Sequence, residues 1–154
     1  MRNFNEADKK KKLARIQVTE NPANLSEEMI SQLEDKIQKS CRDGHLPCGT
    51  AHRIAKDANV PKIAVGELSD KLGIRITNCQ IGCFKVEKNS HDNIDKTRQD
   101  DNILAELDLL SKSNNLDCAK VFEIASKLKL APMAVADVAN SHDLRIRHCQ
   151  LGCF

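Results

Sequence analysis

One stretch of this chain occurs twice, and the duplication limits what the chain can fold into more than any other feature. The first copy runs from Cys48 to Phe84 and the second from Cys118 to Phe154, with a constant offset and no gap. The copies agree best at their ends, which read CQIGCF and CQLGCF. An ungapped repeat of this length indicates a duplicated structural unit.

The chain length fits this interpretation. A chain of 154 residues can build one compact domain or two small ones, and the duplication favours two. We expect a basic N-terminal arm over residues 1–24, a first unit over 25–84, a polar linker over 85–98 and a second unit over 99–154. Each unit alone would bury only a modest core, so we expect the copies to pack on each other or on a partner.

The net charge and the cysteines limit the class of protein and the cellular compartment that we expect. The formal net charge of +2 is too small to identify a nucleic-acid binder. The N-terminus contains the basic run Lys9–Lys12, which could contact phosphate or remain a solvated tail. It has no apolar segment typical of a secretory signal or a membrane span. We therefore expect a cytoplasmic protein that makes no membrane contact and whose seven cysteines are reduced.

Helical patterns precede each copy. Ser26 is a good N-cap, and carboxylates follow it where the positive end of a helix favours them. An apolar residue then recurs every fourth position, which predicts one buried stripe. The stripe before the first copy consists of Met29, Leu33, Ile37 and Cys41. A shorter stripe before the second copy consists of Ile103, Leu107 and Leu110. The sequence predicts turns at Asp43-Gly44 and Asn114-Asn115.

The repeat has the residue spacing of a helix-turn-helix. Ala55 stands where two helices would nearly touch, Asn59 tolerates the left-handed geometry of the turn, and Val60 follows as an apolar plug. The other apolar positions of the first copy are Ile54, Ala58, Val65 and Leu68. Those of the second copy are Ile124, Ala125, Leu128, Leu130, Val135 and Val138. Lys129, which replaces Asn59, is a poorer turn residue. The alternations at 74–76 and 144–146 predict a short strand after each motif.

This order of elements resembles the winged-helix family of DNA-binding domains, over about two thirds of the chain. The resemblance implies a mainly α fold made of tandem duplicated helix-turn-helix units, each with a short C-terminal β element. It implies that the second helix lies in the major groove of duplex DNA and that the strands form a wing on the phosphate backbone. By position, the groove-facing residues would be Lys62, Ile63, Gly66, Glu67 and Asp70, and Pro132, Met133, Ala136, Asp137 and Asn140. The candidate DNA-binding residues are Lys62, Arg75, Asn140, Arg145 and Arg147.

The charges of these helices oppose that role. Base edges and phosphates are read mainly by Arg, Lys, Asn and Gln, whereas carboxylates dominate here. The small side chains suit close packing against another helix instead. DNA contact and a protein-facing use therefore both remain open.

Two Cys-x-x-x-Cys pairs form a second candidate site: Cys79 with Cys83, and Cys149 with Cys153. Gathered together, the four thiols could bind zinc or an iron-sulfur cluster. They could instead be small buried side chains of an apolar strand, with Phe84 and Phe154 as plugs of the core. Cys48 and Cys118 are expected on the core face of their helix.

We interpret the chain as a DNA-associated regulatory protein in which one chain imitates a dimer, and we do not expect an enzyme. Glycine-rich phosphate loops, nucleophile elbows and His-Glu metal helices are absent from the sequence. One alternative is a metal-binding or thiol-sensing protein that uses the paired cysteines. The other is an adaptor that binds a protein partner or forms a homodimer.

Overall fold

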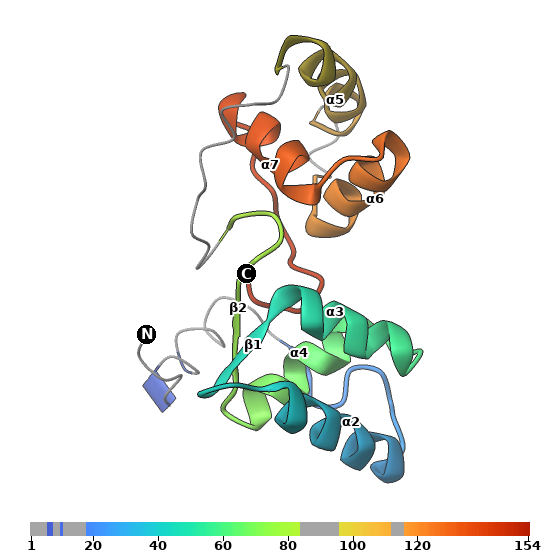
Figure 1. Cartoon of the computed structure of the whole chain (residues 1–154). Coiled ribbons are helices and arrows are strands. Elements are labelled where there is room, and N and C mark those ends of the chain that lie inside the picture. Colours follow the sequence, from blue (N-terminus) through green and yellow to red (C-terminus); the bar gives the residue numbers. More distant parts are fainter. Residues whose placement is uncertain (1–5, 8–9, 11–17, 84–95, 112–115) are drawn as a thin grey trace. The chain divides into compact units, whose positions relative to one another are not determined.

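The computed structural model describes residues 6–7, 10, 18–83, 96–111 and 116–154 (Figure 1). The described part is mainly helical and contains a small parallel sheet of two strands. It forms two compact units. Unit 1 consists of Met1–Cys79 together with Gln150–Phe154, and unit 2 consists of Gln80–Cys149. The end of each repeat therefore packs in the unit that contains the other repeat.

Unit 1 begins with α2, Glu27–Ser40, which packs against the two helices that follow it. The Ser26 hydroxyl accepts a hydrogen bond from the Met29 backbone nitrogen at 3.3 Å, which caps the helix as expected. Leu33 and Ile37 are buried, as the stripe predicted. Met29 at the first turn is 38% exposed, so the apolar stripe is shorter than the sequence indicated.

The bent helix pair consists of α3, Cys48–Asp57, and α4, Lys62–Lys71, which pack on each other. Asn59 adopts φ +53°, the left-handed conformation that the turn needs. The Val60 backbone nitrogen then donates to the Ala55 carbonyl at 3.0 Å, closing the end of α3. The residues expected to fill the core between the helices are buried: Ile54, Ala55, Val65 and Leu68.

The two strands of unit 1 flank this helix pair in sequence. Strand β1, His45–Pro47, and strand β2, Arg75–Thr77, are parallel, with Leu46 opposite Ile76. Parallel strands require a crossover connection, which α3 and α4 provide here. A wing would need a further strand after β2, and the described residues contain none. The predicted wing is therefore absent from the described part of unit 1.

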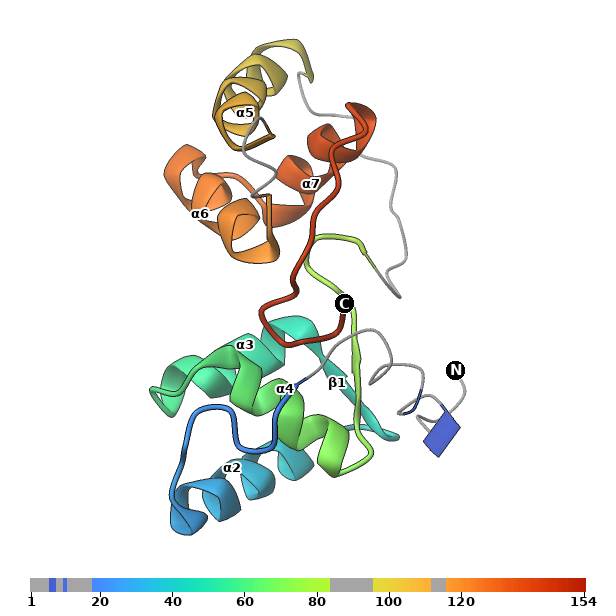
Figure 2. The same cartoon turned by 180° about the vertical axis from the view of Figure 1, so that it is seen from behind.

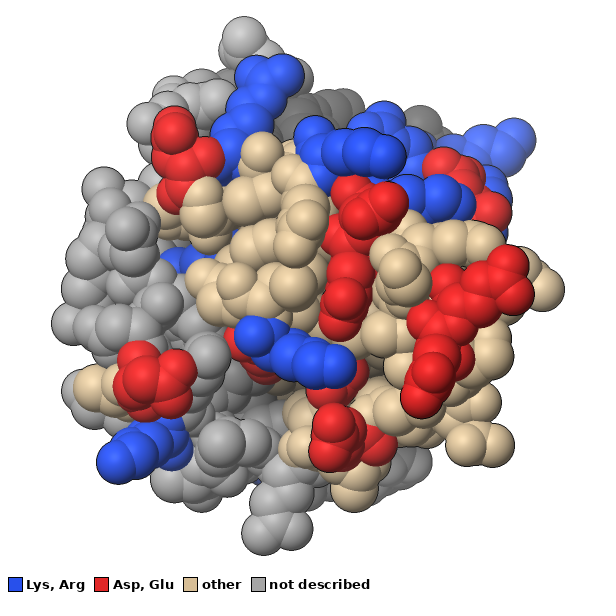
Figure 3. Space-filling model, turned by 90° about the horizontal axis from the view of Figure 1, so that it is seen from below, with Lys and Arg blue, Asp and Glu red and all other residues tan. Residues whose placement is uncertain are grey.

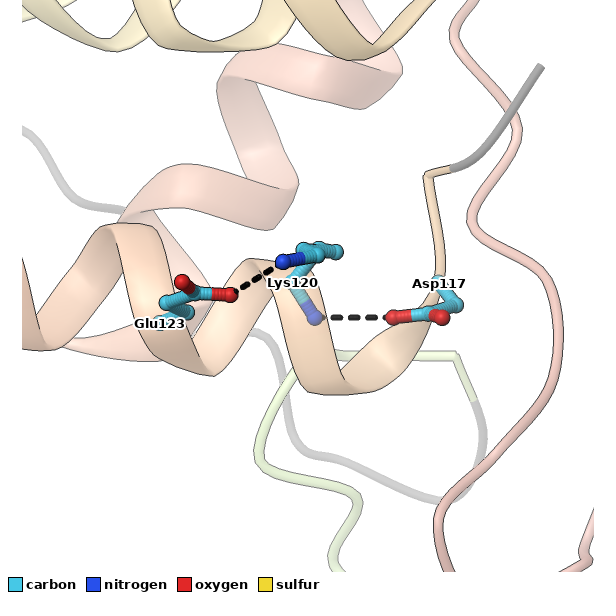
Figure 4. A network of polar contacts seen from close by, with 3 residues as sticks. All are labelled: Asp117, Lys120 and Glu123. Carbon is cyan, nitrogen blue, oxygen red and sulfur yellow. Dashed lines mark hydrogen bonds and ion pairs between the residues drawn. The ribbon is translucent and has the colours of Figure 1, made fainter. Parts of the chain in front are cut away.

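Unit 2 repeats the helical order with α5, Lys96–Ser111, α6, Cys118–Leu128, and α7, Pro132–Ser141 (Figure 1). Figure 4 shows the start of α6, where the Asp117 carboxylate accepts a hydrogen bond from the Lys120 backbone nitrogen at 2.8 Å. The Lys120 Nζ lies 2.6 Å from the Glu123 Oε2 on the next turn. Lys129 has φ +56°, so it fills the turn position despite its side chain.

The second copy does not form the predicted strand. Only an isolated parallel bridge joins Asp117 to Arg147 among the described residues of this copy, in the register that Pro47 and Thr77 have in unit 1. Leu144 and Ile146 are half-buried, whereas Ile74 and Ile76 of the first copy are buried. The expectation of a β element in each repeat is thus met only by the first copy, because the side chains of the second alternation are less deeply buried in a core.

Each unit has its own apolar core. Unit 2 buries Ile103 and Leu107 as predicted, together with the motif residues Ile124, Ala125, Val135 and Val138. Cys48 and Cys118 are both buried, as expected for the core face of their helices. Among the described residues, no helix has the length and hydrophobicity needed to cross a membrane.

Some predicted features lie outside the described residues. These are most of the basic arm and of the linker over 85–98, the lysine run Lys9–Lys12 apart from Lys10, the turn at Asn114-Asn115, and Phe84. The last part of the predicted linker, from Lys96, belongs to α5.

Candidate functional site

The best-defined site in unit 1 is the face of α4 on which the C-terminal segment Gln150–Phe154 lies. We call this segment the tail. In Figures 1 and 2 the tail is the dark red loop that ends at C, next to α3 and α4. Gly66, in the middle of α4, is buried beneath it. A Cβ atom at Gly66 would stand 1.9 Å from the Leu151 carbonyl oxygen. The helix and the tail backbone are therefore closer than any other residue type at position 66 would allow.

The side chain of Leu151 anchors the tail. It is fully buried, and so is the backbone of Gly152 that follows it. Gly152 adopts φ +68°, and a Cβ there would stand 2.7 Å from the Ile63 Cδ1 and 3.1 Å from the Val18 Cγ2. Glycine permits both this left-handed turn and the approach to Ile63. The tail is thus an irregular segment shaped by its glycine, and not the continuous apolar strand that the sequence indicated.

A polar contact fixes the start of the tail. The Lys62 Nζ, at the first turn of α4, donates a hydrogen bond to the Gln150 Oε1 at 2.6 Å. Both side chains are partly buried. The sequence analysis named Lys62 as a candidate DNA-binding residue, and in the structure its ammonium group contacts Gln150.

Unit 2 contains the corresponding arrangement. Gly82, from the end of the first repeat, has φ +73° and comes so close to Met133 that an added Cβ would lie 2.8 Å from its Sδ. Met133 is the repeat counterpart of Ile63, and Gly82 that of Gly152. Ile81, the counterpart of Leu151, is also buried. The two repeat ends therefore dock in the same way, each against the second motif helix of the unit that holds it.

A histidine lies beside the polar end of the site. The pKa of His52, on α3, falls to about 4, first because the ring is buried and second because the Lys62 ammonium is near it. Cys79 acts on the ring in the opposite direction. His52 is consequently neutral at physiological pH. No pattern in the sequence places a particular histidine near a particular cysteine, and the second copy has Phe122 at this position.

Two carboxylates, Glu67 and Asp70, follow on α4 ahead of Lys71 in its last turn. Burial raises the pKa of the Glu67 carboxyl, with further contributions in both directions from neighbouring charges. Glu67 and Asp70 are half-buried on the helix whose first turn holds the tail. A carboxylate that already loses hydration here would be still less favourable facing a phosphate backbone.

The candidate metal ligands are divided between the two units. Cys79 and Cys153 belong to unit 1, whereas Cys83 and Cys149 belong to unit 2. None of these four cysteines forms a disulfide in the described part of the chain; Cys79 is buried and Cys83 is exposed. Within the part of the chain that the structure describes, no three His, Cys, Asp or Glu side chains are grouped to hold a metal ion. The shared four-thiolate site for zinc or an iron-sulfur cluster therefore stays a prediction, which elemental analysis of anaerobically purified protein would test.

The candidate DNA-binding residues fall into two classes. Lys62 and Arg75 are half-buried, and Lys62 already contacts the tail. Asn140, Arg145 and Arg147 are exposed in unit 2. The structure thus separates the first-copy candidates, which lie in packed surroundings, from the second-copy candidates, which face solvent.

Sequence reasoning missed the docking of the tail. The predicted close packing on the small face of α4 exists, but its partner is an irregular segment with a turn and not a helix. Two signals could have indicated this. A glycine at position 66 weakens a helix unless something approaches its backbone. Gly82 and Gly152 also recur at the same place in both repeats.

Known proteins offer no guide to this site. The chain matches no family model, no curated protein and no solved structure.

Proposed function

We propose that this protein is an adaptor whose two helix-turn-helix halves hold short, turn-containing peptide segments on the second helix of the motif. The segment each half recognises has the form Cys-Gln-aliphatic-Gly-Cys-Phe. The proposal rests on the close approach of the Leu151 backbone to Gly66. A single methyl group on the helix at this position would collide with the backbone of the segment. Such a fit selects segments whose backbone can lie directly against the helix.

Three contacts along α4 supply the recognition. The hydrogen bond from Lys62 selects a glutamine, the buried site of Leu151 selects an aliphatic side chain, and Ile63 leaves room only for a glycine with positive φ. A buried leucine contributes about 2 kcal/mol from the hydrophobic effect, and the charge-assisted hydrogen bond adds direction. The combination is typical of a short-peptide site, in which a few anchors set both the register and the identity of the segment.

The same contacts speak against reading DNA through this helix. Ile63 and Gly66, two of the positions that would face the major groove, are beneath the tail. The next groove-facing positions are the carboxylates Glu67 and Asp70. In the view of Figure 3, acidic side chains lie next to basic ones on the face that is drawn. Carboxylates at groove-facing positions oppose the positive charge that duplex binders use.

The test is a peptide-binding measurement on the full chain. The variant Leu151→Asp places a charge in a fully buried position and should release the tail, because an unpaired buried carboxylate is costly. A fluorescent peptide of sequence CQLGCF should then bind under reducing conditions, at least about tenfold more tightly than it binds the wild-type chain, in which the tail competes at high effective concentration.

The controls separate the site from the rest of the surface. Adding Gly66→Val to Leu151→Asp should abolish peptide binding, whereas adding Lys39→Ala, on the exposed side of α2, should leave it unchanged. A peptide carrying alanine in place of its glycine should bind more weakly. A folded Leu151→Asp chain that does not bind the peptide would overturn the adaptor function.

A second candidate function is association with duplex DNA through unit 2, and it rests on the exposure of Arg145 and Arg147. These guanidinium groups follow α7 and are available to phosphates. If they bind DNA, affinity should fall steeply with salt. Replacing both with alanine should then reduce the magnitude of the logarithmic salt slope by about 0.9 for each phosphate that the protein no longer neutralises. Undetectable binding at low salt would remove this candidate.

A further inference from the structure

We infer that the α4 face of unit 1 also accepts the tail of a second copy of this chain, so that two chains can form a dimer by exchanging tails. This inference rests on the proposed function, since it names a partner for the same peptide site. It is supported by the contacts of the tail and by the place where the tail joins its own repeat.

The tail already leaves the unit that contains the rest of its repeat. Residues up to Cys149 pack in unit 2, and those from Gln150 pack in unit 1. The contacts of the tail described above are made with residues of unit 1. Lys62, Ile63 and Gly66 would meet the same atoms if the tail came from another chain. An element that docks outside the unit of its own repeat is the kind of element that proteins exchange between identical chains.

The backbone bends just before the exchanged segment in both repeats. His148 has φ +51° and its repeat counterpart Asn78 has φ +50°. His148 is exposed, and its neighbour Arg147 forms an isolated bridge with Asp117 outside any regular strand. Such a junction can redirect the tail without disturbing a packed helix, because it lies outside the helices and strands.

The two docking segments are interchangeable in sequence. From Cys79 to Phe84 and from Cys149 to Phe154 they differ only by isoleucine against leucine. The counterpart faces are less alike, since Pro132 replaces Lys62 and Ala136 replaces Gly66. Unit 1 therefore combines a close fit with a side-chain hydrogen bond to the tail, and it is the face on which exchange between chains should be strongest.

Closed monomers and exchanged dimers contain the same tail contacts, so concentration decides between them. A flexible tether presents its own tail at an effective concentration of about a millimolar. Exchange should therefore become visible as the chain concentration approaches about a millimolar, and it should be reversible on dilution.

The experiment mixes two full-length variants that are each defective in one half of the contact. Gly66→Val blocks the face and leaves the tail intact, whereas Leu151→Asp spoils the tail and leaves the face intact. Native mass spectrometry at about a millimolar chain concentration should show a one-to-one complex of the two variants. This complex should be at least about tenfold more abundant than the homodimer of either variant alone.

A second measurement keeps the inference testable if either variant unfolds. Wild-type chains with and without ¹⁵N labelling, mixed under reducing conditions, should form mixed dimers, and Lys39→Ala chains should do the same. Wild-type chains that remain monomeric at this concentration, together with a variant pair that does not associate, would overturn the exchange. If the CQLGCF peptide nonetheless binds the Leu151→Asp chain, the adaptor function survives and only the exchange fails.

Discussion

The second motif helices of the two repeats, α4 and α7, hold equivalent segments with different chemistry. On α4 a lysine and a glycine face the tail, and on α7 the same positions are Pro132 and Ala136. On the helix before, His52 is replaced by Phe122. Within α4, the hydroxyl of buried Ser69 donates a hydrogen bond to the Val65 carbonyl at 2.7 Å. The counterpart of Ser69 in α7 is Ala139, whose side chain is apolar.

The difference teaches how a duplicated unit can keep one docking geometry and change its chemistry. The glycine of the docked segment and the long side chain against it persist as Gly152 with Ile63 and as Gly82 with Met133. The polar contact occurs in unit 1, and Pro132 has no side-chain donor to repeat it in unit 2. We therefore expect unit 1 to be the more specific face and unit 2 to hold its segment mainly by apolar burial.

The largest expected effect comes from removing the buried anchor of one tail. Leu151→Ala should lower the free energy of unfolding by about 2–5 kcal/mol, because it leaves a cavity in a well-packed site. The destabilisation should appear in unit 1, as faster amide hydrogen exchange in α4. The matched variant Ile81→Ala should speed exchange in α7 instead. Faster exchange in α7 for Leu151→Ala would contradict the observed assignment of the tail.

The next comparison exchanges the small residues of the two helices. Gly66→Ala should lower the free energy of unfolding by about 1–3 kcal/mol, since the overpacking cost exceeds the gain of about 1 kcal/mol in helix propensity. Urea denaturation provides the measurement. Ala136→Gly is the reciprocal control and should cost about 1–2 kcal/mol, from helix propensity and from the loss of a buried methyl group. If Gly66→Ala were stabilising, the tail could not be as close to α4 as 1.9 Å implies.

A third comparison uses pH. The pKa of His52 in the folded chain, about 4, lies below its ordinary value of 6.5. Folding therefore favours the neutral ring, and this contribution is complete above pH 6.5 and is lost as the pH falls through 4. His52→Phe, which copies Phe122, should remove about 1–2 kcal/mol of that acid sensitivity, after allowing for the solvent that still reaches the ring.

Thermal unfolding of both chains between about pH 7 and pH 4 measures this effect. Glu67, whose pKa is raised by burial, acts in the opposite direction in both chains and cancels in the difference. Parallel pH profiles for the wild-type chain and His52→Phe would show that the buried imidazole carries no charge penalty.

The smallest effect concerns the polar contact of unit 1. Lys62→Met removes the donor to Gln150 and keeps most of the apolar stem, so it should cost about 0.5–1.5 kcal/mol. Peptide affinity in the Leu151→Asp background should fall by a similar free energy. Lys56→Met, an exposed position at the end of α3, is the matched control. Equal effects of the two substitutions would remove the claim that unit 1 recognises glutamine.

Local features of the fold were readable in the sequence because they depend on neighbouring residues. The cap at Ser26, the left-handed turn at Asn59 and the buried stripe of Leu33 and Ile37 all follow from short-range spacing, and the structure confirms them. The pairing of the predicted strand, and with it the expected wing, could not be derived from the sequence in this way. A strand pattern such as 74–76 states which side chains are buried but does not name the strand that pairs with it, and the partner proved to be β1 in parallel.

The sequence by itself determined that one unit was copied, where each helix pair bends, and which residues fill its core, because periodicity and turn chemistry act within a few residues. Only the tertiary structure decided what covers the second helix of each pair. The partner of Gly66 lies far away in the sequence at Leu151, and contacts between distant segments depend on packing that no local pattern encodes. That placement is the reason why we propose a peptide site on a helix whose spacing had suggested a DNA-reading face.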